Sequence, residues 1–146
     1  AYHGLGEQTG SWRVGWLALL LTSMLHAEPA PKRVLLLMSY DPLFPTSHLI
    51  VDSLRDTLER ESPQPIELQV EYLYSKHNNN AEYLQKALSL LQLRRPLSSY
   101  DLIISSDDNA LRLLHRYARP QLPDTPIIFM GVNDGDLIRN VPGTGG

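Results

Sequence analysis

Three continuous apolar runs in the chain each end in a short cluster of small and polar residues. The runs cover residues 34–38, 102–104 and 127–130, and patterns typical of helices separate them. Apolar runs of this length, bounded by turn residues, are typical of central strands in a parallel sheet. Ligands of such sheets bind at the carboxyl ends of the strands, where all three clusters fall. The sequence therefore predicts an α/β domain that carries one face of a small-molecule site at that edge.

The segments around these runs predict alternating strands and helices. We expect strands at residues 33–38, 66–72, 101–105 and 127–130, with helices of one apolar stripe between them. The strand at 66–72 alternates strictly between apolar and polar residues, which is typical of an edge strand with one wet face. An edge-like second strand fits the strand order 2-1-3-4 with right-handed crossovers. The predicted fold is thus a doubly wound parallel sheet whose topological switch lies between the first and third strands.

Composition limits the classes of function. A chain of 146 residues with 42% apolar residues has room for one domain with a real core. The formal net charge of −3 and the pI near 5.9 give no electrostatic footprint for nucleic acid, so no nucleic-acid partner is expected. The absence of cysteine excludes disulfides and thiolate metal sites.

An uncharged apolar stretch at residues 14–25 follows Arg13 and precedes the first strand. About 7–15 apolar residues after a positive charge are typical of a signal peptide, whereas a membrane span needs about 18 or more. Ala27 is a candidate cleavage position, and a Pro-rich exit at 28–31 separates the stretch from the fold. We expect residues 1–31 to contain a signal peptide or a signal anchor, which implies a periplasmic or other extracytoplasmic location. A buried helix of the domain is the alternative interpretation.

Polar residues after the strands supply the candidate binding groups. Asp108 is expected to cap the following helix, because aspartate accepts hydrogen bonds from the free N–H groups of a first helical turn. Asp107 is then freer to meet a ligand amine or hydroxyl. Tyr40 would either stack on a planar ligand or cover the sheet edge, and both interpretations stay open. Gly131 permits a close backbone approach and Asn133 can donate and accept hydrogen bonds, although a plain turn explains this pair equally well.

The sequence contains no recognisable set of residues for catalysis or metal binding. The five histidines lack the paired spacing of metal ligands. No glycine-rich loop follows the first strand to hold phosphate, and no serine lies in a nucleophile-elbow pattern. Residues 133–136 hint at a calcium loop, but the spacing does not match and the closing glutamate is missing. We therefore expect no catalytic residue, no metal and no cofactor in this chain.

Four stretches together carry a family resemblance. They are RVLLLMSYDP (33–42), VEYL (70–73), YDLIISSDDNA (100–110) and FMGVN (129–133). In combination they resemble the substrate-binding-protein-like periplasmic sensor domain at the amino-terminal end of bacterial histidine kinases and diguanylate cyclases. The relatives of that domain are the type I periplasmic binding proteins of ABC transporters. The resemblance covers residues 32–141 and leaves 142–146 as a truncated linker.

This resemblance implies a fold of two lobes hinged around a ligand cleft, with residues 32–141 as the first lobe. It places the following residues at cleft-facing positions of that lobe: Ser39, Tyr40, Ser106, Asp107, Gly131 and Asn133. Relatives among the transporter proteins bind aromatic amino acids and similar small solutes, so the implied partner is a small solute of that kind.

Two functions are compatible with such a lobe. The first is extracytoplasmic sensing of a solute in a membrane receptor with a histidine kinase or diguanylate cyclase output domain. The second is solute binding for an ABC transporter, which needs no attached output. The sequences at 39–42 and 106–110 are more similar to those of the kinase-linked members, which favours the sensor. The membrane would be reached through the amino-terminal segment or through a downstream span.

Export is directly testable. A fusion of residues 1–40 to a reporter that is active only outside the cytoplasm is expected to show activity, because Arg13 and the 14–25 stretch would direct translocation. The measurement is reporter activity in intact cells, and the control fusion carries two aspartates within 14–25. An inactive reporter in the unmodified fusion would exclude export.

Overall fold

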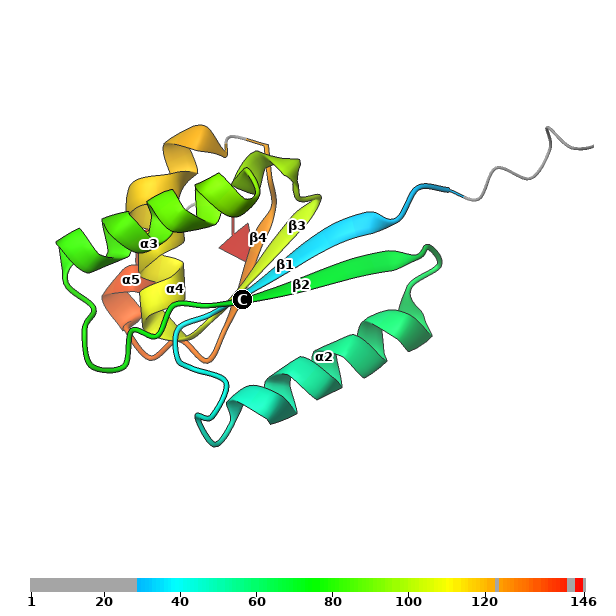
Figure 1. Ribbon diagram of the computed structural model, residues 1–146, viewed down its shortest axis with the longest axis horizontal. Coiled ribbons are helices and arrows are strands. Elements are labelled where there is room, and N and C mark those ends of the chain that lie inside the picture. Colours follow the sequence, from blue (N-terminus) through cyan, green and yellow to red (C-terminus); the bar gives the residue numbers. More distant parts are fainter. Residues whose placement is uncertain (1–28, 123, 142–143, 146) are drawn as a thin grey trace, which may run out of the picture.

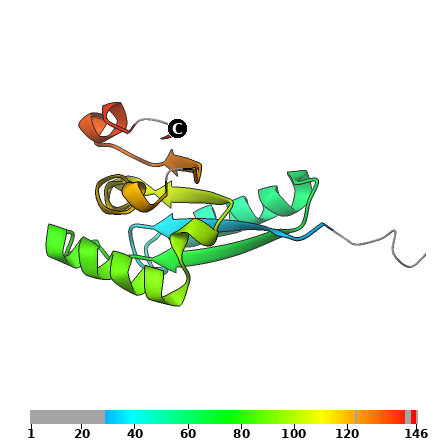
Figure 2. The ribbon, with the colours of Figure 1, turned by 90° about the horizontal axis from the view of Figure 1, so that it is seen from above.

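A computed structural model describes residues 29–122, 124–141 and 144–145 of the chain. Its centre is a parallel sheet with the strand order β2-β1-β3-β4-β5, and Figure 2 shows the strands one beside another from β2 to β4. The strand bounds are Lys32–Met38 (β1), Ile66–Tyr72 (β2), Leu102–Ser106 (β3), Ile127–Met130 (β4) and Thr144–Gly145 (β5). The predicted fold class and the order 2-1-3-4 are confirmed. The short β5 pairs with β4 and lies within the segment 142–146 that was predicted as a linker.

The apolar stretch at 14–25 lies outside the described residues, so its interpretation as an export signal stays a prediction. Within the described part of the chain, no helix combines the length and the apolar character needed to cross a membrane.

Helices cover both faces of the sheet, as a doubly wound arrangement requires (Figure 1). The helix bounds are Ser47–Glu61 (α2), Ala81–Arg94 (α3), Asp107–Leu113 (α4) and Gly135–Arg139 (α5). α2 packs on one face, whereas α3, α4 and α5 contribute to the core on the other face. Shorter turns are the 3₁₀ segments Leu97–Ser99 and Arg119–Gln121 and the π-helical segment Leu114–Ala118 that continues α4.

β1 separates two apolar cores. Leu35 and Leu37 join the core under α3 and α4, whereas Leu36 and Met38 join the core under α2. All four side chains are at most 1% exposed. Because successive side chains of a strand point to opposite faces, only a continuous apolar run can serve both cores at once. This explains why the run at 34–38 occupies a central position.

β2 forms the sheet edge beside β1, as the strict alternation of its sequence predicted. All seven of its residues are partly exposed. On its polar face, Glu71 pairs with Arg94 and Glu67 pairs with Arg95, at the end of α3. These ion pairs keep the charged side chains of β2 beside the carboxyl end of α3, where positive side chains are favoured by the helix dipole.

Core packing on the α4 face should dominate the stability of the domain. Leu111 of α4 is fully buried, and Leu93 of α3 is 83% exposed. We expect Leu111→Ala to lower the free energy of unfolding by about 2–5 kcal/mol, because it leaves a cavity in a packed core. The matched variant Leu93→Ala should change it by less than about 0.5 kcal/mol. Urea unfolding followed by circular dichroism measures both, and equal losses for the two variants would contradict this packing.

Candidate functional site

The carboxyl ends of three neighbouring strands meet at one edge of the sheet. Met38 of β1 lies opposite Ser106 of β3, and Ser106 lies opposite Met130 of β4. The next residues of each strand, among them Tyr40 and Asp107, therefore emerge together, as predicted for a parallel sheet. We use the name edge cluster for the surface group Tyr40, Phe44, Lys76, Asp107 and Gly131.

A buried layer of hydrogen-bonded polar residues, formed by Ser39, Ser75 and Asn109, supports the edge cluster. Ser39 Oγ donates a hydrogen bond to the Ser106 carbonyl oxygen at 2.7 Å and accepts one from the Ala110 N–H at 2.8 Å. Ser75 Oγ donates to the Ser39 carbonyl oxygen at 2.6 Å, and Asn109 Nδ2 donates to Ser75 Oγ at 3.0 Å. These bonds connect the ends of β1 and β3, the start of α4 and the loop after β2. Because buried polar groups are costly unless they are paired, this network fixes the positions of all four segments.

Ser39 and Ser106 were predicted to face the ligand, and the structure places both of them out of reach. Their exposed fractions are 0% and 1%. Ser106 Oγ donates to Asp107 Oδ2 at 3.0 Å, so it acts on the edge cluster only through that carboxylate. Both serines support the surface residues and do not form the surface themselves.

Two aromatic rings and one ammonium group form the first half of the edge cluster. The rings of Tyr40 and Phe44 lie 4.5 Å apart between centroids and are tilted by 42°. Lys76 Nζ lies 5.0 Å from the centroid of each ring. Distances below about 6 Å give a favourable interaction between a cation and the negative face of an aromatic ring. Tyr40 therefore does more than cover the sheet edge, since it shares a cation with Phe44.

Asp107 and Gly131 form the second half of the edge cluster. Both have a left-handed backbone, with φ of 68° at Asp107 and 66° at Gly131. A Cβ atom at residue 131 would lie 3.2 Å from Asp107 Oδ1, so the glycine leaves room for that carboxylate. A positive φ in a residue other than glycine is uncommon and marks positions where strain serves a local purpose. Here the turn aims the Asp107 carboxylate toward the surface beside Gly131.

Burial and neighbouring charges both act on the titratable groups at this edge. Burial raises the pKa of the Asp107 carboxyl above its usual value, and the nearby negative charge of Asp108 adds to the effect. The Ser106 hydroxyl and the Lys76 ammonium act in the opposite direction on that pKa. Burial also raises the pKa of the Tyr40 hydroxyl, and the negative charges of Asp107 and Asp108 raise it further. A further positive charge near Asp107 would therefore be favourable.

The prediction that Asp108 caps its own helix is wrong. The N-cap residue of α4 is Ser106, which makes no capping bond through its side chain. Asp108 Oδ1 instead accepts hydrogen bonds from the backbone N–H groups of Asn133 at 2.8 Å and Asp134 at 3.1 Å. The loop after β4 supplies both of these donors. Asp108 thus fixes the loop that carries Asn133, whose exposed side chain donates to the Gly131 carbonyl oxygen at 3.3 Å.

Sequence reasoning missed two members of the edge cluster, Phe44 and Lys76, and two members of the buried layer, Ser75 and Asn109. Phe44 and Asn109 follow continuous apolar runs and were not singled out, whereas Ser75 and Lys76 follow β2, which has no such run. For Ser75 and Lys76, the missed signal was the segment Tyr74–Lys76, which begins two residues after the end of the edge strand. Since all strands of a parallel sheet end on the same edge, that segment belonged to the same site.

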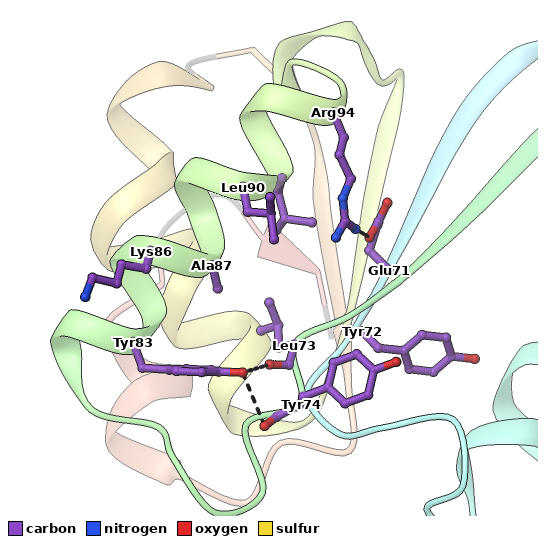
Figure 3. A pocket seen from close by; sticks show the side chains of 10 residues that line it. Glu71, Tyr72, Leu73, Tyr74, Tyr83, Lys86, Ala87, Leu90 and Arg94 are labelled. Carbon is purple, nitrogen blue, oxygen red and sulfur yellow. Dashed lines mark hydrogen bonds and ion pairs between the residues drawn. The ribbon is translucent and has the colours of Figure 1, made fainter.

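A hollow of about 480 Å³ lies away from the edge cluster, between α3 and the end of β2 (Figure 3). Its floor includes Leu73 and Ala87, and Figure 3 shows the Tyr83 ring on one side of it and Arg94 with Glu71 on the other. This volume is within the range of small-molecule pockets.

Several polar groups around this hollow already have partners. Arg94 bonds to Glu71, and Lys86 pairs with Glu82 at 2.7 Å. The Tyr83 hydroxyl donates to the Leu73 carbonyl oxygen at 2.7 Å. A ligand would have to break these bonds before it gained its own. In the edge cluster, Lys76 makes no ion pair with any described residue, so that site keeps unused binding capacity.

Comparison of the chain with protein-family models, with curated proteins and with solved structures gave no match. In the described residues, no three histidine or acidic side chains gather in the manner of a metal site.

The left-handed turn at Gly131 gives a stability test of the edge geometry. Gly131→Ala should lower the free energy of unfolding by about 1–3 kcal/mol, because alanine disfavours a positive φ and its Cβ would press on Asp107. Gly135→Ala is the control, since its φ is not in the left-handed region and its Cβ would meet only the end of Arg139 at 3.5 Å. Thermal or urea unfolding measures both variants. A control that loses as much stability as Gly131→Ala would show that the turn is not specially constrained.

Proposed function

We propose that the chain is the first lobe of an extracytoplasmic binding domain that recognises a small solute in a signalling receptor. The observation that carries this proposal is the location of the edge cluster at the switch between β1 and β3. In open α/β sheets this is where ligands bind. Tyr40 follows β1, Asp107 follows β3, and they lie close enough for the Asp107 charge to raise the pKa of Tyr40.

The chemistry of the edge cluster is suited to binding. It presents two aromatic faces, one ammonium group, one partly buried carboxylate and an open glycine turn. These groups recognise a planar or charged solute through stacking, ion pairing and hydrogen bonds. General acid–base or nucleophilic catalysis needs a reactive group beside a base that a third residue orients, and the edge cluster does not have that arrangement.

A second lobe would complete the site by closing over this edge. Hinge closure around a ligand buries it from water, and each lobe then supplies only part of the contacts. An exposed edge cluster that has supporting hydrogen bonds below it is consistent with one wall of such a cleft. The resemblance of residues 32–141 to sensor domains of histidine kinases and diguanylate cyclases supports the same arrangement.

The alternative is a solute-binding receptor that delivers its ligand to an ABC transporter. The chemistry of the lobe is the same in both cases, so the choice rests on the sensor-like stretches of sequence. The gene downstream of Gly146 decides between them. A second lobe, an apolar run of about 20 residues and a cytoplasmic output domain would support the sensor. A stop codon after the second lobe, with permease genes alongside, would support the transport receptor.

Substitutions in the edge cluster should weaken solute binding by a protein that contains both lobes. We expect Asp107→Ala and Tyr40→Ala each to cost about 1–3 kcal/mol of binding free energy, the scale of a lost polar partner. Asp56→Ala is the matched control, because Asp56 is exposed on α2. Isothermal titration calorimetry measures all three. Full affinity in both edge variants would refute the assignment of the site.

A further inference from the structure

We propose that Tyr40 and Phe44 form a subsite for an organic ammonium ion, and that Lys76 occupies this subsite until the ligand displaces it. The inference rests on the proposed function in one respect, since it places the solute at the same edge of the sheet. It adds the chemical class of the ligand and a competitor that the protein itself supplies.

The geometry around Lys76 is that of a cation held by two rings. Its Nζ atom lies 5.0 Å from the centroid of Tyr40 and 5.0 Å from that of Phe44. The tilt of 42° between the rings turns both faces toward one point. Aromatic side chains arranged around one position are the usual means of binding an ammonium head group. The two rings therefore bind the Lys76 ammonium in the same way as we propose that they bind a ligand ammonium.

Little else holds Lys76 in place. Two other lysines in the described residues have carboxylate partners, since Lys32 pairs with Asp101 at 3.3 Å and Lys86 with Glu82 at 2.7 Å. For Lys76, the contacts recorded in the described part of the chain are the two rings and a longer-range attraction to Asp107. The residue is exposed and lies in the loop between β2 and α3. Its ammonium group can therefore move into water without breaking an ion pair.

The surrounding charge favours a cation over an anion. The charge of Asp107 interacts with that of the Lys76 ammonium, and Asp108 contributes a second negative charge nearby. Asp108 is occupied by the N–H groups of Asn133 and Asp134, which leaves Asp107 to meet the ligand. An anionic ligand would be repelled by both aspartates. An ammonium ion would gain the two ring faces and the Asp107 carboxylate together.

A tethered competitor lowers the apparent affinity by the fraction of time for which it leaves the subsite open. Two contacts between a cation and partly exposed rings correspond to an occupancy factor of about 5- to 30-fold. Removal of the Lys76 ammonium should therefore strengthen the binding of an ammonium ligand by about that factor. This direction is the opposite of that expected for a lysine that binds the ligand directly.

The test uses the full 146-residue chain, tetramethylammonium chloride as the probe and sodium chloride at equal ionic strength as the blank. Ring signals of Tyr40 and Phe44 are followed by NMR in wild type, Lys76→Met and the matched control Lys86→Met. Methionine keeps an apolar side chain but removes the charge. We expect Lys76→Met to bind the probe about 5- to 30-fold more tightly than wild type, and Lys86→Met to bind it as wild type does.

A second readout uses the wild-type protein alone. The ε-methylene signal of Lys76 should be shifted by the ring currents and should move to the position of an exposed lysine as the probe is added. Equal or weaker probe binding by Lys76→Met, or a Lys76 signal that the probe does not move, would overturn the inference. If sodium acetate shifts the ring signals and the ammonium probe does not, the edge is still a binding site and only its assigned charge is wrong. If neither probe shifts them, this inference fails, whereas the proposed function fails only if the edge variants also keep full affinity in calorimetry.

Discussion

The geometry of the edge cluster depends on the hydroxyl group of Ser39. This hydroxyl donates to the end of β3 and accepts from the start of α4, while the Ser39 carbonyl accepts from Ser75 in the loop after β2. The backbone repeats these connections, since Ser39 N–H donates to the Ser106 carbonyl and Ser75 N–H donates to the Ser39 carbonyl. A buried hydroxyl with no partner would be costly, so these segments are held in one arrangement. Tyr40, Lys76 and Asp107 are each one residue away from a member of this network, and their relative positions follow from it.

Most of the fold could be predicted because hydrophobic pattern and strand position have the same physical cause. A strand between two cores needs apolar side chains on both faces, which β1 supplies, and a strand at an edge needs them on one face, which β2 supplies. Together with the apolar runs of the third and fourth strands, these patterns predicted the order 2-1-3-4. Thr144–Gly145 carries no such pattern, and its pairing with β4 could not be read from the residues alone.

The site was less predictable because its details depend on contacts between distant segments. Asp108 has the sequence context of a helix cap, yet the loop after β4 offers it two backbone donors that no local pattern reveals. Ser39 and Ser106 lie at the expected ends of the expected strands, but both are buried and their hydroxyls bond to other groups of the chain. Lys76 contacts Tyr40 and Phe44, which lie more than 30 positions away in the sequence. This contact could have been predicted only from the fact that all strands of a parallel sheet end at the same edge.

Displacement of Lys76 by a ligand, as proposed above, would also change the contact between two loops. Phe44 belongs to the loop between β1 and α2, where Ser47 Oγ donates to the Asp41 carbonyl oxygen at 2.8 Å and so ties the loop to the first turn of α2. Lys76 belongs to the loop between β2 and α3. While its ammonium lies over the two rings, Lys76 links these two loops. A ligand ammonium that took its place would remove this link and would itself bind the rings of Tyr40 and Phe44. The loop that leads into α3 would then lose its contact with the loop between β1 and α2. In the sensing role proposed above, this would link the charge of a solute to the contact between the two loops.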